Sequence, residues 1–171
     1  GKGTLQQALG CSNRTSIRAK LKPCNAFVGH MPSDGSRSFP HLGPLQRSMG
    51  IELEMMGDSR CAVYVDVTDA HLNKGGVAHG GLHATLLDTA MGGATVAALS
   101  KEEWCATAQL DISYIEAARV GTRLNCEARV LRRGRGIAHV EGEISDQEGS
   151  VIAKARGTWG IWPGRPSHLK K

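Results

Sequence analysis

The fold of this chain is decided by one stretch, residues 73–100, which reads NKGGVAHGGLHATLLDTAMGGATVAALS. A glycine-rich turn leads into about twenty residues of Leu, Ala, Thr and Gly without proline, enough for a helix of roughly 30 Å. One face of that helix carries Leu82, Leu86, Ala90, Gly93 and Ala97. The opposite face also lacks Lys, Arg and Glu; it carries Ala84, Thr85, Asp88, Gly92, Thr95 and Leu99. Such a helix is predicted to be buried on both sides.

Asp88 is the one acid of this predicted helix. A buried carboxylate costs several kcal/mol unless it is paired, hydrogen-bonded or protonated. Asp88 therefore has either a structural role, bonded to nearby Thr hydroxyls or backbone, or a chemical one. Because the sheet of the same chain can cover only the leucine face, we expect a second subunit or a ligand to cover the Asp88 face.

The composition is that of one ordinary globular domain, with 171 residues, 40% hydrophobic and 22% charged. No apolar run is long enough to span a membrane, so we predict no membrane segment. Five scattered cysteines without C-x-x-C spacing indicate reduced thiols and a cytoplasmic protein. The histidines show no H-x-x-x-H or H-E-x-x-H spacing, and we expect no metal site.

The net charge of +5 is concentrated near the N-terminus. Residues 1–33 hold five basic side chains and no acid, whereas residues 34–171 carry equal numbers of both signs. With only seven aromatic residues, the chain lacks the basic and aromatic stripe of a nucleic-acid surface, so we exclude nucleic acid as a partner. We predict a basic extension over residues 1–40, mobile or draped on a partner, a domain over 41–162, and a tail over 163–171.

The segments around the central helix alternate apolar and polar residues with period two, which is typical of antiparallel strands with one dry face. A short helix over 40–49 is predicted to precede strands over 51–56 and 60–67. After the long helix, four further strands are predicted over 107–114, 124–130, 138–144 and 153–159. In the first of these, Thr107 is predicted to share a face with Gln109. The expected class is α+β, one long helix on a curved antiparallel sheet of about six strands.

The motif His79-Gly80-Gly81, followed by Asp88 in a helix of small residues and then by four strands, resembles the hotdog-fold acyl-CoA thioesterases of the PaaI-like group. The resemblance spans residues 40–162. It implies a hotdog fold, hydrolysis of an acyl-CoA, and no cofactor beyond the coenzyme A of the substrate. It also implies a homodimer or homotetramer in which each active site takes its Asp from one subunit and its Gly and Asn from another.

The resemblance also implies roles for individual residues. Asp88 corresponds to the general base or nucleophile, and Gly80 to the residue whose N–H polarises the thioester carbonyl. Asn73 would orient water or the thioester. Thr107 stands where relatives carry Ser, and His79 is either an acid–base group or a residue that only starts the helix. Candidate substrate-binding residues are Gly81, Thr85, Gly92, Arg132, Arg133 and Arg135, of which the three arginines would hold the phosphates of coenzyme A.

Thioester hydrolysis is chemically compatible with this residue set. A thiol of pKa about 8.5 leaves as thiolate without a strong general acid, so one base and one oxyanion donor suffice. Two alternatives remain open: a hotdog module that binds acyl-CoA without hydrolysis, and a hydratase. The hydratase requires a catalytic histidine on the helix, and His83 lies about 140° from Asp88 on a helical wheel. The acyl group, whether aryl-acetyl, short or medium chain, is not encoded in any motif.

Overall fold

The structure is a computed structural model that describes residues 42–165 and residue 167. The extension predicted over residues 1–40, the start of the first predicted helix and most of the tail predicted over 163–171 lie outside the described residues. No helix of the described part of the chain is long and apolar enough to cross a membrane.

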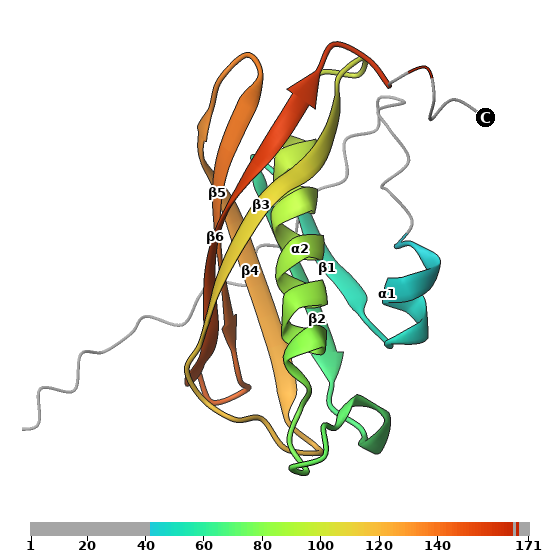
Figure 1. Ribbon diagram of the computed structural model, residues 1–171, viewed down its shortest axis with the longest axis vertical. Helices are drawn as coiled ribbons and strands as arrows, with labels where there is room; N and C mark the ends of the chain where they lie inside the picture. Colours follow the sequence, from blue (N-terminus) through green and yellow to red (C-terminus); the bar gives the residue numbers. More distant parts are fainter. Residues whose placement is uncertain (1–41, 166, 168–171) are drawn as a thin grey trace, which may run out of the picture. The chain divides into compact units, whose positions relative to one another are not determined.

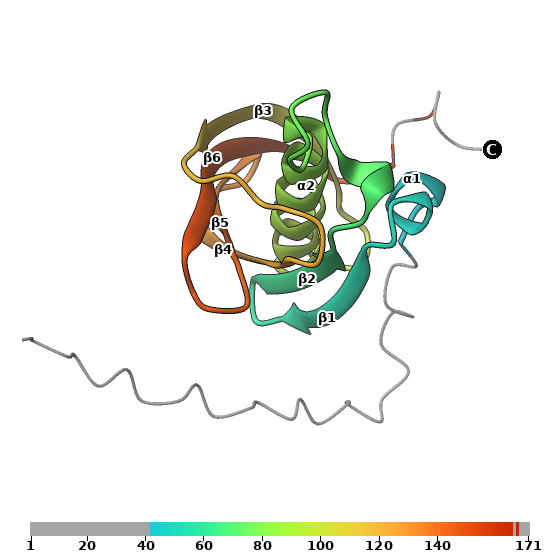
Figure 2. The ribbon, with the colours of Figure 1, turned by 90° about the horizontal axis from the view of Figure 1, so that it is seen from below.

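The described chain forms one six-stranded antiparallel sheet that curves around one long helix (Figures 1 and 2). The strand order is β1-β2-β4-β5-β6-β3, so β1 and β3 are its two edges. The elements are α1 (Pro44–Ser48), β1 (Glu52–Gly57), β2 (Arg60–Asp66), η1 (Asp69–His71), α2 (Gly80–Ala97), β3 (Trp104–Tyr114), β4 (Arg123–Arg133), β5 (Ile137–Ser145) and β6 (Val151–Trp162). The α+β class and the curved sheet of six strands predicted from the sequence are confirmed.

Helix α2 is buried more widely than a single leucine stripe, because the sheet wraps around it (Figure 2). Leu87 and Met91 are completely buried beside Leu86, although the sequence pattern did not place them on the apolar face. Thr95, expected on the opposite face, is also completely buried; its hydroxyl donates to the Met91 carbonyl at 2.9 Å, which satisfies it within the helix. The expectation for Thr95 was therefore wrong.

The predicted alternation of the strands is confirmed for β2, β4, β5 and β6. The inner side chains pack on α2 to form the core, whereas the outer ones are charged and exposed. On the outer face Arg129 pairs with Glu141 at 2.6 Å and Lys154 with Glu143 at 2.7 Å. These ion pairs are open to water and contribute little to stability.

Strand β3 breaks the alternation at one residue. Thr107 pairs with the buried Trp159, whereas Gln109 pairs with Thr158, so Ala108 is an extra residue between two register positions. A bulge of this kind turns the side chain before it to the other face of the sheet. Thr107 therefore points inward, towards α2, and the prediction that it shares a face with Gln109 is wrong.

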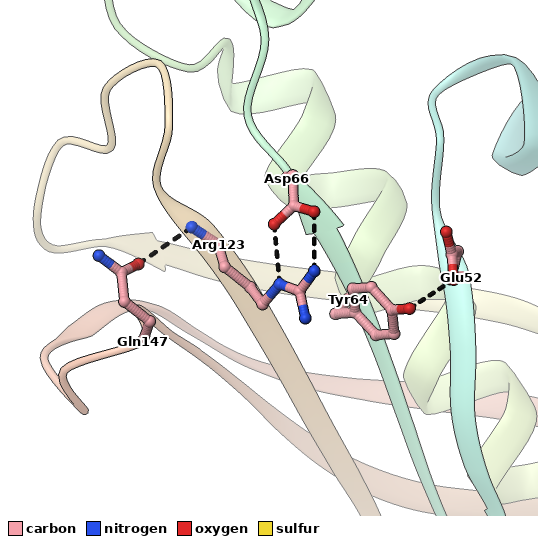
Figure 3. Close-up of polar contacts among 5 residues, drawn as sticks. All are labelled: Glu52, Tyr64, Asp66, Arg123 and Gln147. Atoms are coloured by element: carbon pink, nitrogen blue, oxygen red, sulfur yellow. Dashed lines mark hydrogen bonds and ion pairs between the residues drawn. The ribbon is translucent and has the colours of Figure 1, made fainter.

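An exposed polar cluster joins the ends of β1, β2 and β4 (Figure 3). Arg123 binds both carboxylate oxygens of Asp66 at 2.8 Å and lies 4.5 Å from the centre of the Tyr64 ring. The Tyr64 hydroxyl in turn donates to Glu52. The hydrogen bonds from Arg123 hold the pKa of Asp66 below its usual value. Asp66 is thus an acid whose charge is already neutralised by a cation.

Candidate active site

Asp88 lies half-buried on α2, in contact with β3. Its Oδ1 accepts a hydrogen bond from the Thr107 hydroxyl at 2.7 Å, across the bulge that turns Thr107 inward. None of the ion pairs in the described chain involves Asp88. Asp88 is therefore oriented by a neutral donor and, unlike Asp66, is not neutralised by a cation, which keeps its carboxylate available to a proton or an electrophile.

A buried tryptophan of β6, Trp159, lies beside Thr107 in the sheet. Trp159 is only 2% exposed and is the β6 partner of Thr107. Gly92, one helical turn beyond Asp88, lies against the same indole: a Cβ at this position would be 3.6 Å from Trp159 Nε1. Asp88, Thr107, Gly92 and Trp159 thus come together, and we call them the acid cluster.

A second set of predicted residues gathers at the start of α2. His79 is the N-cap of the helix, and its Nδ1 accepts a hydrogen bond from the Gly81 N–H at 2.8 Å. A ring nitrogen that accepts carries no proton, so the proton of the neutral imidazole is on Nε2. The helix-start interpretation of His79 accounts for this geometry.

The N–H of Gly80 is the group that this cap leaves available. Gly80 is the first residue of α2, where backbone N–H groups have no partner within the helix. No described residue accepts a hydrogen bond from this N–H. Because the N-terminal end of a helix carries partial positive charge, the Gly80 N–H can bind a developing oxyanion. We call Gly80, Gly81, His79 and Tyr114, whose hydroxyl bonds the Gly80 carbonyl, the donor cluster.

Asn73 forms a tight turn seven residues before Gly80. Its Oδ1 accepts from the Gly75 N–H at 2.7 Å, and its own N–H donates to the Val77 carbonyl at 2.8 Å. No hydrogen bond in the described chain connects Asn73 to Asp88. Asn73 is therefore close to the donor cluster in the sequence, and it is not hydrogen-bonded to Asp88 of the acid cluster.

The remaining predicted substrate-binding residues have mixed surroundings. The Thr85 hydroxyl donates to the Gly81 carbonyl at 2.9 Å and so bonds its own helix. Arg133 is paired with Glu103. Arg132 and Arg135 lie exposed on or beside the β4–β5 hairpin and form no ion pair within the described residues. Of the three arginines, these two have side chains that a phosphate can reach without breaking an existing pair.

His83 lies on the buried side of α2, as the helical wheel predicted. It is 4% exposed, and neither ring nitrogen has a hydrogen-bond partner among the described residues. Burial lowers its pKa, and the electrostatic interaction with nearby His79 lowers it further, so the ring is neutral. Since it faces away from Asp88, His83 does not supply the helix histidine that a hydratase needs.

One hollow of the described surface lies elsewhere, on the outer face of the sheet. It encloses about 890 Å³, and Arg129, Glu141, Glu143 and Lys154 are among the residues that line it. These four side chains are the ones already paired with one another. None of the residues of the acid or donor clusters lines this hollow. The candidate catalytic group is therefore Asp88, whose carboxylate has no cation beside it among the described residues, and not a residue of this hollow.

The two clusters are separated along α2. Gly80 and Asp88 are eight residues apart in a continuous helix, which corresponds to about 12 Å along its axis at 1.5 Å per residue. A base and an oxyanion donor must both reach one carbonyl group at hydrogen-bond distance. Along α2, the two groups are therefore further apart than one hydrogen-bond distance.

Comparisons with known proteins agree with this fold. The sequence profile of the thioesterase superfamily matches residues 75–153. A Pseudomonas aeruginosa protein named as a candidate esterase is 30% identical over 124 residues, which cover 68% of this chain and 91% of that protein. The chain belongs to the thioesterase superfamily. The predicted hotdog fold and the predicted class of enzyme, a thioester hydrolase, are thereby confirmed.

Other members of the superfamily are similar over shorter or more divergent stretches. Mouse acyl-coenzyme A thioesterase 13 is 32% identical over 95 residues, 54% of this chain and 66% of the mouse protein. The PaaI protein from the phenylacetic acid degradation operon of E. coli superposes with a TM-score of 0.64 at 25% identity, covering 70% of this chain and 85% of PaaI. A hypothetical thioesterase of Streptococcus pneumoniae, solved with coenzyme A, superposes with a TM-score of 0.62 at 28% identity, covering 68% and 88%.

Proposed function

We propose that this thioesterase hydrolyses the thioester of an acyl-CoA, with Asp88 as the general base or nucleophile. The observation that carries the proposal is the cation-free carboxylate of Asp88, held by Thr107 on a helix that bears no other charge. The mouse relative is named as an acyl-coenzyme A thioesterase, and the Streptococcus protein was solved with coenzyme A. Both names support the choice of coenzyme A as the thiol part of the substrate.

The chemistry requires few steps. As a base, Asp88 takes a proton from water while the water oxygen forms a bond to the thioester carbon. The resulting oxyanion accepts a hydrogen bond from the Gly80 N–H. When the intermediate collapses, the carbon–sulfur bond breaks and the thiolate leaves, taking the proton from Asp88 or from solvent. As a nucleophile, Asp88 would instead form a mixed anhydride that water then hydrolyses.

The 12 Å between the two clusters leads us to place the active site between two copies of the chain. In an antiparallel pair of α2 helices, Gly80 of one copy can lie opposite Asp88 of the other, and Asn73 accompanies Gly80. Strand β3, eleven residues long, is an edge of the sheet and offers unpaired backbone groups to a second copy. We therefore propose a homodimer, or a tetramer built from such dimers.

Around the thioester, the proposed substrate contacts divide between its two parts. Trp159 and Gly92, of the acid cluster, would contact the acyl group, whether small, medium or aromatic. The exposed Arg132 and Arg135 are proposed for the phosphates of coenzyme A, because guanidinium groups bind phosphate with paired hydrogen bonds. His79 supports the donor cluster as a cap.

The test is release of free thiol from a panel of aryl-acetyl, short-chain and medium-chain acyl-CoAs. Asp88→Asn keeps the shape of the side chain but removes the base, and we expect its kcat to fall by about a hundredfold or more. Asp66→Asn is the matched control, since Asp66 is exposed and already paired with Arg123. It should leave turnover unchanged.

Two results would contradict the proposal. Wild-type protein that binds acyl-CoA but releases no thiol from any substrate would favour the binding module. Wild-type activity that survives in Asp88→Asn, with the assembly intact by light scattering, would remove Asp88 from the chemistry. The best substrate of the panel identifies the acyl class.

A further inference from the structure

One peptide group at the start of α2 is held by side chains from both sides. The carbonyl oxygen of Gly80 accepts a hydrogen bond from the Tyr114 hydroxyl at 3.3 Å. The N–H of the same peptide, which belongs to Gly81, donates to His79 Nδ1 at 2.8 Å. His79 is the N-cap that the sequence motif contains, whereas Tyr114 lies 34 residues after Gly80 and was not predicted as a site residue from the sequence.

Two consecutive glycines make such support necessary. Without a Cβ, Gly80 and Gly81 can adopt many backbone conformations, and the first turn of a helix has few internal hydrogen bonds. Because a peptide group is planar, bonds at its oxygen and at its N–H together fix the orientation of the whole plane. This holds the Cα of Gly80 in place. The Gly80 N–H belongs to the preceding peptide, and the helical φ and ψ of Gly80 then set its direction.

The ring of Tyr114 also contacts Gly80 directly. A Cβ built on Gly80 would lie 3.3 Å from Tyr114 Cε1 and 3.4 Å from Cζ, so the ring packs against the position that a side chain would occupy. On its other side the ring lies near His83, with the two ring centres 6.0 Å apart and the planes tilted by 41°. The buried His83 ring thus lies beside Tyr114 at the base of the donor cluster.

Tyr114 is the last residue of β3, and Thr107 is seven residues earlier on the same strand. The strand therefore bonds the acid of α2 through Thr107 and the donor end of α2 through Tyr114. A rigid strand that contacts both clusters fixes each of them relative to the sheet.

We propose that Tyr114 is a positioning residue, which holds the Gly80–Gly81 peptide so that the Gly80 N–H points at the thioester carbonyl. The inference rests on the proposed function, because it assigns a purpose to the same oxyanion donor. Tyr114 acts through Gly80 and takes no part in proton transfer or bond formation.

The test compares two variants at this position with a control at the other tyrosine. Tyr114→Phe keeps the ring and loses the hydrogen bond; we expect kcat to fall about fivefold, as for the loss of one ordinary hydrogen bond. Tyr114→Leu loses ring and bond, and kcat should fall between about ten- and a hundredfold, since small displacements of catalytic groups have such effects. KM should change less than about twofold in both, because uniform substrate binding is kept.

Tyr64→Phe is the matched control, since it removes a hydroxyl that donates to Glu52 on the edge strand β1. Its kcat should equal that of the wild type. A higher kcat in Tyr114→Phe than in Tyr114→Leu would measure the contribution of the ring, and the remaining deficit of Tyr114→Phe would measure that of the hydroxyl. A general loss of stability would not produce this graded pattern.

Three outcomes would overturn the inference. A kcat in Tyr114→Leu equal to the wild type would remove Tyr114 from the site. A raised KM with kcat unchanged would show that the ring contacts substrate rather than positioning Gly80. If Tyr114→Leu does not fold, the inference is overturned when the kcat of Tyr114→Phe equals that of Tyr64→Phe. Failure of the wild type to release thiol from any acyl-CoA would instead refute the proposed function, and this inference with it.

Discussion

The two clusters on α2 differ in what they contain and in what they lack. The acid cluster has a carboxylate held by Thr107, but no backbone N–H of the described residues bonds it. The donor cluster at the helix start has a free N–H on Gly80 but no acid. Each is therefore half of a hydrolytic site, although both lie on one helix and contact one strand.

The helix itself explains why the halves do not meet. Eight residues of α2 separate Gly80 from Asp88, and a continuous helix cannot fold back on itself to close about 12 Å. A helix packed against a curved sheet is rigid on this scale, so the proposed mechanism takes the missing half from a second copy of the chain. One chain can therefore carry every residue of a catalytic motif, here Gly80 and Asp88, without placing them together in one site.

The sharpest test of the donor cluster removes the Gly80 N–H alone. Gly80 is the first helical residue, where proline is tolerated, and His79 before it already has the extended conformation, φ −67° and ψ 138°, that proline requires. Gly80→Pro should lower kcat by about a hundredfold or more, as for the loss of an oxyanion donor. Steady-state thiol release measures this effect.

Gly80→Ala is the matched control for that substitution. It places a Cβ against the Tyr114 ring as proline does, at 3.3 Å, but it keeps the N–H. We expect a fall in kcat of less than about tenfold, because the exposed ring can move by a few tenths of an ångström. Equal losses in the two variants would mean that crowding, and not the N–H, is responsible.

A smaller effect is expected in the acid cluster when only the orientation of Asp88 is disturbed. Thr107→Val keeps the shape of the side chain and removes the hydroxyl, and kcat should fall about tenfold, as for a hydrogen bond to a charged group. Thr107→Ser should stay near the wild-type rate. Ser113→Ala, on the outer side of β3, serves as the control; a similar loss there would indicate a general effect on the strand.

The smallest expected effect is on the free energy of unfolding, through His83, which is buried beside Tyr114 of the donor cluster. Because the pKa of buried His83 is lowered, the unfolded chain binds a proton below about pH 6.5 that the folded chain does not. The free energy of unfolding should therefore decrease as the pH falls from 7 to 5, and urea titrations of His83→Leu should show a weaker decrease.

Much of the fold was predictable because its signals are local. The uncharged helix and the period-two alternation of the strands depend on neighbouring residues, and the structure confirms both. The exceptions come from long-range packing: Thr95 is buried because the sheet wraps further around α2 than one stripe requires, and its hydroxyl finds a backbone partner within the helix. No spacing in the sequence indicates how far a sheet curves.

The site was predictable only in part, for a related reason. The motif named Asp88, Thr107 and Gly80, and the structure does bring Asp88 and Thr107 together. However, the bulge at Ala108 that turns Thr107 inward has no signal in the alternation, which placed Thr107 on the outer face. Tyr114 was missed because its contact with Gly80 joins residues far apart in the chain. Arg133 was grouped with its neighbours, although Glu103 engages it.

The central claim, that Asp88 and the Gly80 N–H act on one thioester from two copies of the chain, is tested most directly by mixing two inactive variants. Asp88→Asn and Gly80→Pro, dissociated together and reassociated in equal amounts, form hybrid dimers in which one of the two sites is intact. Thiol release should recover to about a quarter of the wild-type rate, since about half of the dimers are hybrids. Hybrids that form, as seen by native mass spectrometry, but release no more thiol than the separate variants would contradict the claim.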